Sequence, residues 1–451
     1  MKSLFLYIFF ISTNLFSQSL YFPPISGDDW EILSLHSQGW DSTKIDNLYG
    51  FLQDNNTKAF LVLKNGKIII EKYFDTFTKD SLWYWASAGK TITSLLVGLA
   101  QQEGFLSIDD STSKFLGNGW TSAPPEKEKL ITIKDQLSMT SGLNDLVFNS
   151  DCTSPDCLQY LAEAGTRWAY HNAPYTLLDS VIQNSTGLTL NQYFNSRVRT
   201  KIGMNGFFIK SGFNNVMFST PRSMARFGLL ILNGGKWENN VLLTDNVYFN
   251  QMINSSQTIN KSYGYLWWLN GKESYMLPQS QLIFPGELVP NAPSDMFSGM
   301  GKNGQFLNIV PSEKLIVIRM GDSPDNSFVP NLLNNDLWIY LNDVINPLSV
   351  VEANDFPPHE YSLEQNYPNP FNPSTKIKFS IPLNTEQQGL VHIRIYDVLG
   401  NEIAVLLNEY MVAGNYEIIF DAVSKNISSG IYFYKLEIGN FISVKKMIYL
   451  K

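Results

Sequence analysis

Residues 85–96 read Trp85-Ala86-Ser87-Ala88-Gly89-Lys90-Thr91-Ile92-Thr93-Ser94-Leu95-Leu96. At about 100° per residue, this stretch predicts a helix whose apolar stripe comprises Ile92, Leu95, Leu96 and Leu99. Ser87, Lys90 and Ser94 fall on the opposite face, and the first two are close enough for their hydroxyl and amine to hydrogen-bond. Because only an activated serine attacks a carbonyl, the amine and the positive end of the helix dipole would assist Ser87. The same pattern also occurs by chance on solvated helix faces.

A second candidate segment, residues 165–175, contains Tyr170-His171-Asn172. In an extended loop Tyr170 and Asn172 project to the same side, because side chains alternate along an extended chain. A phenol becomes a usable base when a cation lies beside it, and Lys90 is the candidate cation. The alternative is that Tyr170, one of 22 tyrosines, packs in a core.

The two motifs together resemble those of the serine β-lactamases and penicillin-binding proteins, particularly the class C enzymes and their esterase and peptidase relatives. Ser87-Ala88-Gly89-Lys90 is similar to the nucleophile motif, and Tyr170-His171-Asn172 to the Tyr-x-Asn form of the second motif. The resemblance extends over about residues 44–340, and the segments 130–143 and 221–228 share it.

The resemblance implies roles for four residues. Ser87 would be the acylated nucleophile, and Lys90 and Tyr170 would share the proton transfers. Asn172 would orient the lysine or hydrogen-bond the substrate. Lys90 and Tyr170 both remain candidates for the base, because coupled titrations belong to the pair.

The family's third motif, Lys-Thr-Gly, is absent from the corresponding region, residues 296–305. Gly299 and Gly301 would still let the backbone approach a ligand closely, and an amide near Gly301 would join that of Ser87 in an oxyanion hole. The departure weakens the expectation that a β-lactam carboxylate is recognised, unless Lys302 substitutes for the missing lysine. Trp267 and Trp268 would wall an acyl pocket or pack in the core.

Competing catalytic schemes find less support. No Gly-x-Ser-x-Gly motif occurs in the sequence. His171 lies between Tyr170 and Asn172, so in an extended segment its ring points away from their side, which argues against a Ser-His-Asp triad. The four histidines and two cysteines lack clustered zinc spacing, so we expect neither a metal nor an organic cofactor.

Strand patterns occur at both ends of this region. Residues 59–63 and 68–73 predict a hairpin, since Asn65-Gly66 supplies the positive φ values of a two-residue turn. Residues 306–310 and 315–320 predict a second strand pair, and helical periodicity dominates between the two pairs. We therefore expect an α/β (α+β) fold: an antiparallel sheet built from both ends, flanked by helices and a helical lobe, with a cleft between sheet and lobe.

A separate domain follows a proline-rich linker at residues 346–365. Short strands predict a small all-β sandwich over residues 366–451. The expected strands are Lys376 to Ile381, Val391 to Tyr396, Tyr416 to Phe420, Ile431 to Ile438 and Lys445 to Leu450. The segment resembles the type IX secretion sorting domain of Bacteroidota, opening with Asn366-Tyr367-Pro368-Asn369-Pro370-Phe371-Asn372-Pro373. The alternative is a carbohydrate-binding or adhesive module.

The amino-terminal end predicts export. Residues 1–18 combine Lys2 with an apolar run over residues 4–11, as signal peptides do, and the run is too short to span a bilayer, so we expect no transmembrane helix. In an exported chain Cys152 and Cys157 would form a disulfide, the alternative being two free thiols. The net charge of −8, from 33 basic and 41 acidic residues, argues against nucleic acid as a partner.

These features predict an exported serine hydrolase, with residues 19–345 as the catalytic domain. It would cleave an ester or amide in a small molecule or peptide through an acyl-enzyme. The sorting domain implies the type IX machinery as a partner, and secretion through the periplasm to the medium or outer surface of a Gram-negative bacterium. The alternative is a penicillin-binding-type receptor of the same fold that is acylated but deacylates slowly or not at all, or that only binds. The substrate stays open among esters, D-amino-acid peptides, β-lactams and oligoamides.

Overall fold

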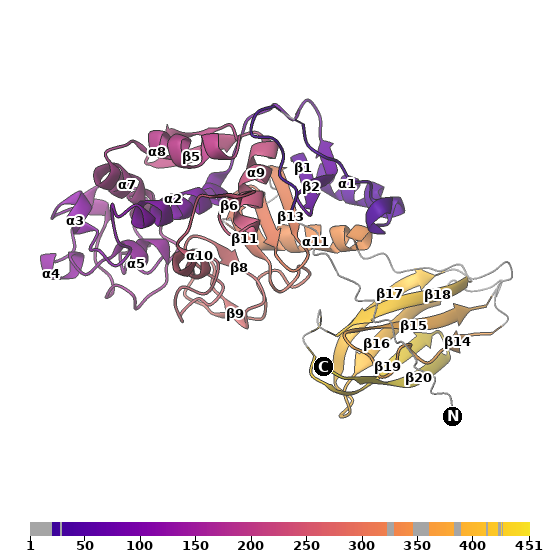
Figure 1. Cartoon of the computed structure of the whole chain (residues 1–451). Coiled ribbons are helices and arrows are strands. Elements are labelled where there is room, and N and C mark those ends of the chain that lie inside the picture. Colours follow the sequence, from indigo (N-terminus) through magenta and orange to yellow (C-terminus); the bar gives the residue numbers. More distant parts are fainter. Residues whose placement is uncertain are drawn as a thin grey trace, which may run out of the picture. The chain divides into compact units, whose positions relative to one another are not determined.

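The structure is a computed structural model that describes residues 20–27, 29–322, 329–345, 360–382, 389–411, 414–422, 425 and 427–451. These residues fall into two compact units, one comprising residues 20–34 and 52–335, the other residues 35–51 and 336–451 (Figure 1). The expected signal peptide and residues 346–359 of the expected linker lie outside the described residues.

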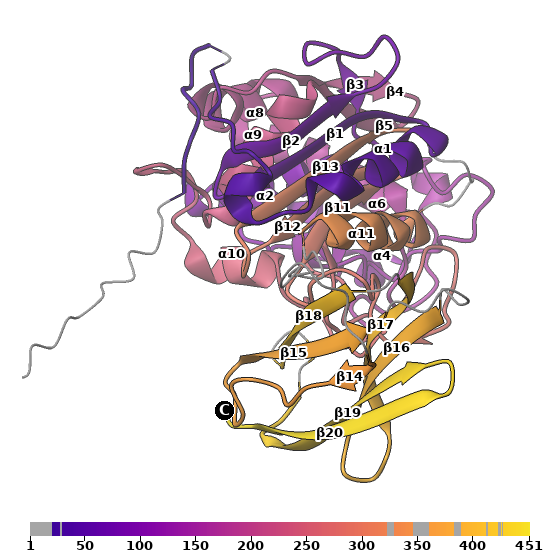
Figure 2. The same cartoon turned by 90° about the vertical axis from the view of Figure 1, so that its right-hand side faces the viewer.

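An antiparallel sheet of six strands organises the first unit. Its order is β2-β1-β13-β12-β11-β8. The strands are β1 (Thr57–Lys64), β2 (Lys67–Tyr73), β8 (Trp268–Leu269), β11 (Phe297–Gly301), β12 (Gln305–Val310) and β13 (Leu315–Gly321). Strand β1 pairs with β13 in the register Val62↔Val317, and Figure 2 shows β2, β1 and β13 side by side. The prediction of one sheet built from both ends of the region is confirmed.

The turns of this sheet follow from local residues. Asn65 and Gly66, which join β1 to β2, have φ values of 53° and 84°, as a type I′ turn requires. Strands β12 and β13 are buried along their whole length, which explains why they read as almost continuous apolar runs.

Helix α9 (Pro221–Leu232) packs against β1, β12 and β13. Gly228 makes this approach close: a Cβ atom there would lie 2.9 Å from Leu307 Cδ1 and 3.0 Å from Ile316 Cγ2. The residue type thus sets the spacing between helix and sheet.

Most of the chain between β2 and β8 forms a helical lobe. Its main helix, α2 (Lys90–Gln102), is buried around almost its whole circumference, polar residues included. Further helices are α3 (Ser113–Leu116), α4 (Pro125–Glu128), α5 (Ile133–Leu137), α6 (Asn172–Thr176), α7 (Leu178–Thr186), α8 (Leu190–Arg197) and α10 (Asn246–Met252). A small sheet of order β3-β5-β4 joins β3 (Trp83–Tyr84), β4 (Phe207–Ser211) and β5 (Asn214–Ser219). Two separate two-stranded sheets pair β6 (Lys236–Trp237) with β7 (Asn240–Val241), and β9 (Ser274–Tyr275) with β10 (Phe284–Pro285).

The carboxyl-terminal unit carries two sheets around a shared apolar cluster. One sheet contains β14 (Ser362–Leu363), β15 (Ser374–Ile381) and β18 (Gly414–Asp421). The other contains β16 (Gly389–Tyr396), β17 (Glu402–Met411), β19 (Gly430–Ile438) and β20 (Phe441–Tyr449). Along the chain, the division between the two units falls within helices α1 (Ile45–Asp54) and α11 (Asn331–Ile345). The expected β-sandwich is confirmed.

Two details of this unit differ from the sequence prediction. Strand β17 was not predicted, because its run through Leu406-Leu407 lacks the strict apolar-polar alternation of a strand with one buried face. Strand β20 begins at Phe441, four residues before the predicted start, since its exposed face carries the apolar Ile442 and Val444.

In the described part of the chain, no helix is both long and apolar enough to cross a membrane.

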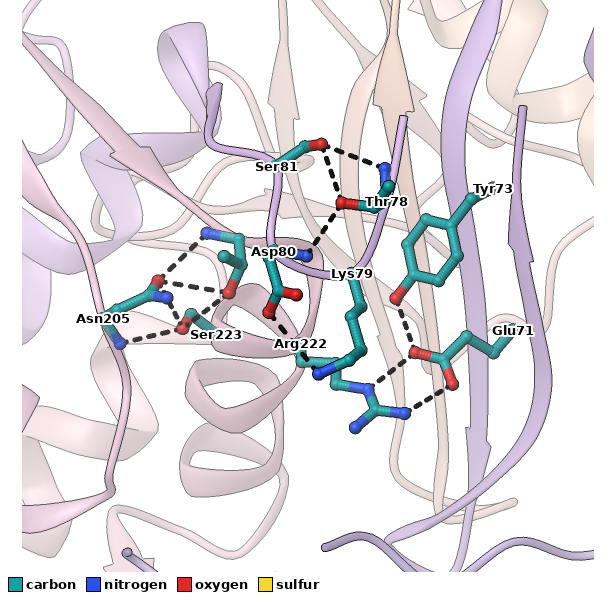
Figure 3. Close-up of polar contacts among 10 residues, drawn as sticks. Glu71, Tyr73, Thr78, Lys79, Asp80, Ser81, Asn205, Arg222 and Ser223 are labelled. Carbon is teal, nitrogen blue, oxygen red and sulfur yellow. Dashed lines mark hydrogen bonds and ion pairs between the residues drawn. The ribbon is translucent and has the colours of Figure 1, made fainter. Parts of the chain in front are cut away.

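One ion pair ties α9 to the edge strand of the large sheet. Arg222 Nε and Nη2 donate to the Glu71 carboxylate at 2.7 and 2.8 Å, and the Tyr73 hydroxyl donates to the same carboxylate at 2.5 Å (Figure 3). Both charged side chains are only 15% exposed. Such a bidentate, largely buried pair is stronger than a surface pair, and losing one partner leaves the other poorly solvated.

We expect Glu71→Gln to lower the free energy of unfolding by about 1–3 kcal/mol, because the Arg222 guanidinium loses a charged, bidentate partner. Urea unfolding followed by circular dichroism measures the change. Asp80→Asn is the matched control, since the Lys79–Asp80 pair nearby is 3.5 Å long with Asp80 80% exposed (Figure 3). That variant should stay within about 0.5 kcal/mol of wild type, and an equal loss in both variants would contradict the special role of Glu71.

Candidate active site

Ser87 and Lys90 meet as the sequence predicts. Ser87 lies in a short 3₁₀ turn, Ala86–Gly89, and Lys90 is the first residue of α2. The Lys90 Nζ atom donates to Ser87 Oγ at 2.9 Å. Ser87 is partly exposed, whereas only 5% of Lys90 is exposed. The hydroxyl is therefore accessible to a reactant while its partner amine is shielded from water.

The turn that presents Ser87 is hydrogen-bonded to strand β5 through the residue before it. Trp85, directly before it, donates its backbone amide to Met217 O and its indole nitrogen to Ser219 Oγ, each at 2.8 Å. Ala86 has a φ of 45°, a left-handed conformation that costs energy for any residue with a Cβ. Strand β5 thus anchors a strained turn whose next residue is the candidate nucleophile.

Burial changes the protonation of Lys90. Loss of solvation lowers the pKa of Lys90 to about 7, although the negative charges of Asp151 and Asp179 act in the opposite direction. A substantial fraction of the amine is therefore unprotonated at neutral pH, and an unprotonated amine beside a hydroxyl can accept its proton.

Aromatic rings surround the same amine. Lys90 Nζ lies 4.3 Å from the ring centre of Tyr175 and 5.3 Å from that of Tyr170. The Tyr170 ring is stacked on Trp268, with centres 5.7 Å apart and planes 17° apart. Trp267 packs instead between Phe227 and Phe297. Of the two candidate tryptophans, Trp268 therefore borders the site, and Trp267 belongs to the core.

Tyr170 lies beside the nucleophile, because the Ser87 side chain lowers the pKa of the Tyr170 phenol. Burial raises the pKa of Tyr170 above its usual value, and this effect outweighs the lowering by Ser87. The direction is opposite to the one a phenolate base requires. At neutral pH Tyr170 is a neutral phenol, suited to donate a proton.

Asn172 takes a different position from the one expected. It is the first residue of α6 rather than part of a continuous extended loop, and its Nδ2 atom donates to Asp151 Oδ1 at 2.8 Å. Its Oδ1 atom is buried without a hydrogen-bond partner among the described residues. Through this bond Asn172 contacts the loop that contains Asp151. The sequence alone did not predict that this loop lies against the second motif.

His171 is 2% exposed, and neither of its ring nitrogens has a hydrogen-bond partner in the described part of the chain. Burial lowers the pKa of His171 to about 4. A triad histidine must accept from serine and donate to a carboxylate. The geometry does not provide these two bonds.

The region of the third motif forms β11, which lies against the Ser87 turn. A Cβ atom at Gly301 would lie 2.4 Å from Trp85 O and 3.0 Å from Ala88 N. One at Gly299 would lie 3.1 Å from Thr91 Cγ2. Glycine at 301 is therefore what lets the strand backbone approach the nucleophile. Lys302 is exposed in the turn after β11.

The predicted disulfide between Cys152 and Cys157 is present, with Cα atoms 5.8 Å apart. It closes a loop immediately after Asp151, the acceptor of the Asn172 bond. Among the described residues, no cluster of three or more His, Cys, Asp or Glu side chains is arranged to hold a metal ion.

Comparison with known proteins agrees with this geometry. Residues 53–332 match the model of the beta-lactamase family. The chain belongs to the beta-lactamase family. Residues 365–450 match the secretion system C-terminal sorting domain, which indicates type IX secretion to the cell surface or exterior in Bacteroidota.

Relatives of this beta-lactamase family member are distant. An uncharacterized protein of Alkalihalophilus pseudofirmus is 24% identical over 309 residues, covering 60% of this chain and 85% of that protein. Protein flp of Staphylococcus aureus is 30% identical over 155 residues, covering 30% of this chain and 31% of flp. The match to flp therefore spans less than a third of that relative.

Solved structures share the fold. A candidate beta-lactamase from Bacteroides dorei has a TM-score of 0.53 at 18% identity, covering 68% of this chain and 99% of that one. A candidate 6-aminohexanoate-dimer hydrolase from Bacillus anthracis has a TM-score of 0.52 at 18% identity, covering 66% and 81%. At these identities the likeness concerns the fold alone.

Sequence reasoning missed three residues around Lys90. Tyr175 and Asp179 lie four positions apart along α6 and α7, and Asp151 directly precedes Cys152. Burial raises the pKa of Asp179 to about 7. The i, i+4 spacing of Tyr175 and Asp179 after the second motif was the available signal. Nothing local singled out Asp151.

We expect Gly301→Ala to separate β11 from the Ser87 turn, because the new methyl group would collide with backbone atoms that cannot rotate away. Thermal unfolding should reveal a loss of about 1–3 kcal/mol, and labelling of Ser87 by a fluorophosphonate should slow at least tenfold. Gly299→Ala is the control, since its nearest neighbour is a side-chain methyl group at 3.1 Å. Equal effects of the two substitutions would contradict the close approach assigned to Gly301.

Proposed function

We propose that this beta-lactamase family member is a serine hydrolase that cleaves an ester or an amide through an acyl-enzyme on Ser87. The observation that carries the proposal is the 2.9 Å bond between Lys90 Nζ and Ser87 Oγ. Burial lowers the pKa of the same Lys90 amine to about 7, so the amine can accept the proton of the hydroxyl that it contacts. A hydroxyl beside an amine of which a substantial fraction is unprotonated at neutral pH is an activated nucleophile.

In acylation, unprotonated Lys90 accepts the proton of Ser87 while Ser87 Oγ bonds to the substrate carbonyl carbon. The oxyanion that forms is stabilised by backbone amides of Ser87 and of β11 near Gly301, each worth roughly 3 kcal/mol in related sites. Tyr170, a neutral phenol, donates its proton to the leaving group as the bond between the carbonyl carbon and the leaving group breaks, and regains one from the Lys90 ammonium. Lys90 is therefore the base and Tyr170 the acid in this step.

Deacylation uses the same groups with water as the nucleophile. Water loses a proton to unprotonated Lys90 and bonds to the acyl carbon. The Ser87–acyl bond then breaks, Tyr170 donates its proton to Ser87 Oγ, and the Lys90 ammonium returns a proton to Tyr170. Products are the free acid and the starting enzyme, so atoms and charge balance without a cofactor.

The site favours substrates without a carboxylate to be bound beside the scissile group. Lys-Thr-Gly is absent from residues 296–305, where the family's third motif would lie, and Lys302 in that region is exposed in the turn after β11. Apolar side chains are exposed on two loops joined to the second motif: Leu146, Phe148, Leu282 and Ile283. One loop contains Asp151, which bonds Asn172, and in the other Gln281 Nε2 donates to Trp168 O at 3.0 Å. Esters or amides with apolar groups fit these loops better than β-lactams or D-alanyl peptides.

Ser87→Ala tests the assignment directly. Wild-type protein incubated with a fluorophosphonate should gain one covalent adduct, located at Ser87 by peptide mass spectrometry, and hydrolyse a short-chain p-nitrophenyl ester. Ser87→Ala should lose both activities, whereas Ser180→Ala, an exposed serine of α7, should retain them. The labelling rate should rise with pH to a plateau, with its midpoint near pH 7, because Lys90 must be unprotonated. An active enzyme unmodified at Ser87 would refute the proposal, and labelling without turnover would indicate a receptor.

We also propose that residues 1–18 are a signal peptide and that the protein reaches the exterior through the type IX pathway. The match of residues 365–450 to the sorting domain supports this route. The proposed order is a hydrolase domain at residues 19–345, a linker at 346–365 and the sorting domain at 366–451.

Removing the residues after 355 should leave ester hydrolysis in vitro unchanged, because helix α11 and the large sheet stay intact. In a producing cell with a type IX system, the truncated protein should accumulate in the periplasm, while the full chain reaches the medium or surface. Immunoblots of cell fractions measure this distribution. Export of the truncated form, or loss of substrate hydrolysis after purification, would contradict the sorting role.

A further inference from the structure

A short loop closed by the disulfide lies against the second motif. We call residues 149–158 the disulfide loop. The backbone amide of Ala173, in the first turn of α6, donates to Ser150 O at 3.1 Å. Within the loop, Cys152 N donates to Asn149 O at 3.1 Å. The loop is thus hydrogen-bonded to the helix that begins with Asn172.

Apolar packing holds the same two segments together. Leu158, directly after the second cysteine, and Ala173, directly after Asn172, are both 0% exposed and belong to one buried cluster. The other members are Trp120, Ala123, Ile131 and Leu143. Because one end of the disulfide loop is buried with the start of α6, their spacing is set by core packing rather than by loop flexibility.

Asp151 determines the orientation of the Asn172 amide. Its Oδ1 atom accepts from Asn172 Nδ2 at 2.8 Å. A carboxylate can only accept, so the amide must turn its nitrogen toward Asp151 and its oxygen away. That oxygen is the buried atom without a partner among the described residues. Asn172 therefore presents an acceptor, and not a second donor, on the side away from Asp151.

Asp151 also acts on Lys90 through its charge. Among the charges that oppose the effect of burial on the pKa of Lys90, that of Asp151 is the larger and that of Asp179, on α7, the smaller. The other titratable groups that face the amine are Tyr175 on α6 and Tyr170 before it, and both are neutral phenols because burial raises the pKa of each. Strand β11 brings no titratable side chain between residues 297 and 301.

We propose that Asp151 is a positioning residue of the acylation site, which orients the Asn172 amide and is itself held in place by the Cys152–Cys157 disulfide. The inference rests on the proposed function for its role in acylation. The negative charge of Asp151 also sets the pH at which Lys90 becomes available as a base. The disulfide contributes because Cys152 is the next residue, and cross-linking restricts the conformations open to the loop.

Four full-length variants test this role. Asp151→Asn keeps a side-chain acceptor for Asn172 but removes the charge, and Asp151→Ala removes both. The double variant Cys152→Ser/Cys157→Ser releases the loop. Asp156→Asn, an exposed carboxylate in the same loop, is the matched control.

Two readouts are taken between pH 5 and 10. The first is the rate of fluorophosphonate labelling at Ser87. The second is competitive acetylation of the Lys90 amine by trace acetic anhydride, quantified by peptide mass spectrometry, which reports the protonation of Lys90 without requiring activity. Thermal unfolding of each variant shows whether its fold is intact.

Removing a negative charge beside Lys90 destabilises its ammonium form, so the midpoint must move to lower pH. Asp151→Asn should shift both midpoints down by about one pH unit or less and keep at least half of the plateau labelling rate. Asp151→Ala should show the same shift with a plateau about tenfold lower, and the double serine variant should lower the plateau in the same direction. Asp156→Asn should match wild type in both readouts.

The outcomes separate the two claims. Midpoints of wild-type value in both Asp151 variants, or a wild-type plateau in Asp151→Ala, would overturn the role of Asp151, because a purely structural residue would change only the melting temperature. A wild-type protein that is never labelled at Ser87 would overturn the proposed function. In that case the acetylation midpoints still decide whether Asp151 controls the charge of Lys90.

Discussion

The site depends on the burial of one amine. Removing an ammonium group from water is costly, and at Lys90 the fold reduces this cost by favouring the unprotonated form, with the pKa lowered to about 7. A bond to Ser87 Oγ and the faces of Tyr170 and Tyr175 supply the contacts that water would have supplied. An exposed lysine at the same position would be protonated and could not act as a base.

Burial of this amine requires chain segments that are far apart in sequence. Helix α2 places Lys90 inside the lobe, α6 brings Tyr175 over it, and β11 closes the other side of the Ser87 turn. Helix α2 supplies the shielded base, α6 supplies an aromatic wall, and β11 supplies a backbone that approaches the Ser87 turn closely at Gly301. The large sheet makes this possible because its hairpins from the two ends of the region pair with each other, which brings β11 back to the residues that follow β2.

Local patterns were sufficient to predict several elements. The Asn65-Gly66 turn, the paired strands β12 and β13, and the helix bearing Lys90 follow from turn chemistry and hydrophobic periodicity. Strand β17 was missed because it lacks alternation, and the helical start at Asn172 was missed because Tyr170 and His171 before it are extended or irregular. In both cases tertiary contacts outweighed a weak local pattern.

The sequence by itself determined which groups could react. The three-residue separation of Ser87 and Lys90, across the short turn that leads into α2, sets their contact, and the absence of Lys-Thr-Gly at residues 296–305 follows directly from the sequence. Only the tertiary structure decided how these groups are charged, because a pKa depends on burial and on neighbours that the chain brings from elsewhere. Tyr170 is a neutral phenol and Lys90 titrates near neutrality for that reason, and Asp151 enters the site only because the fold places its loop against α6.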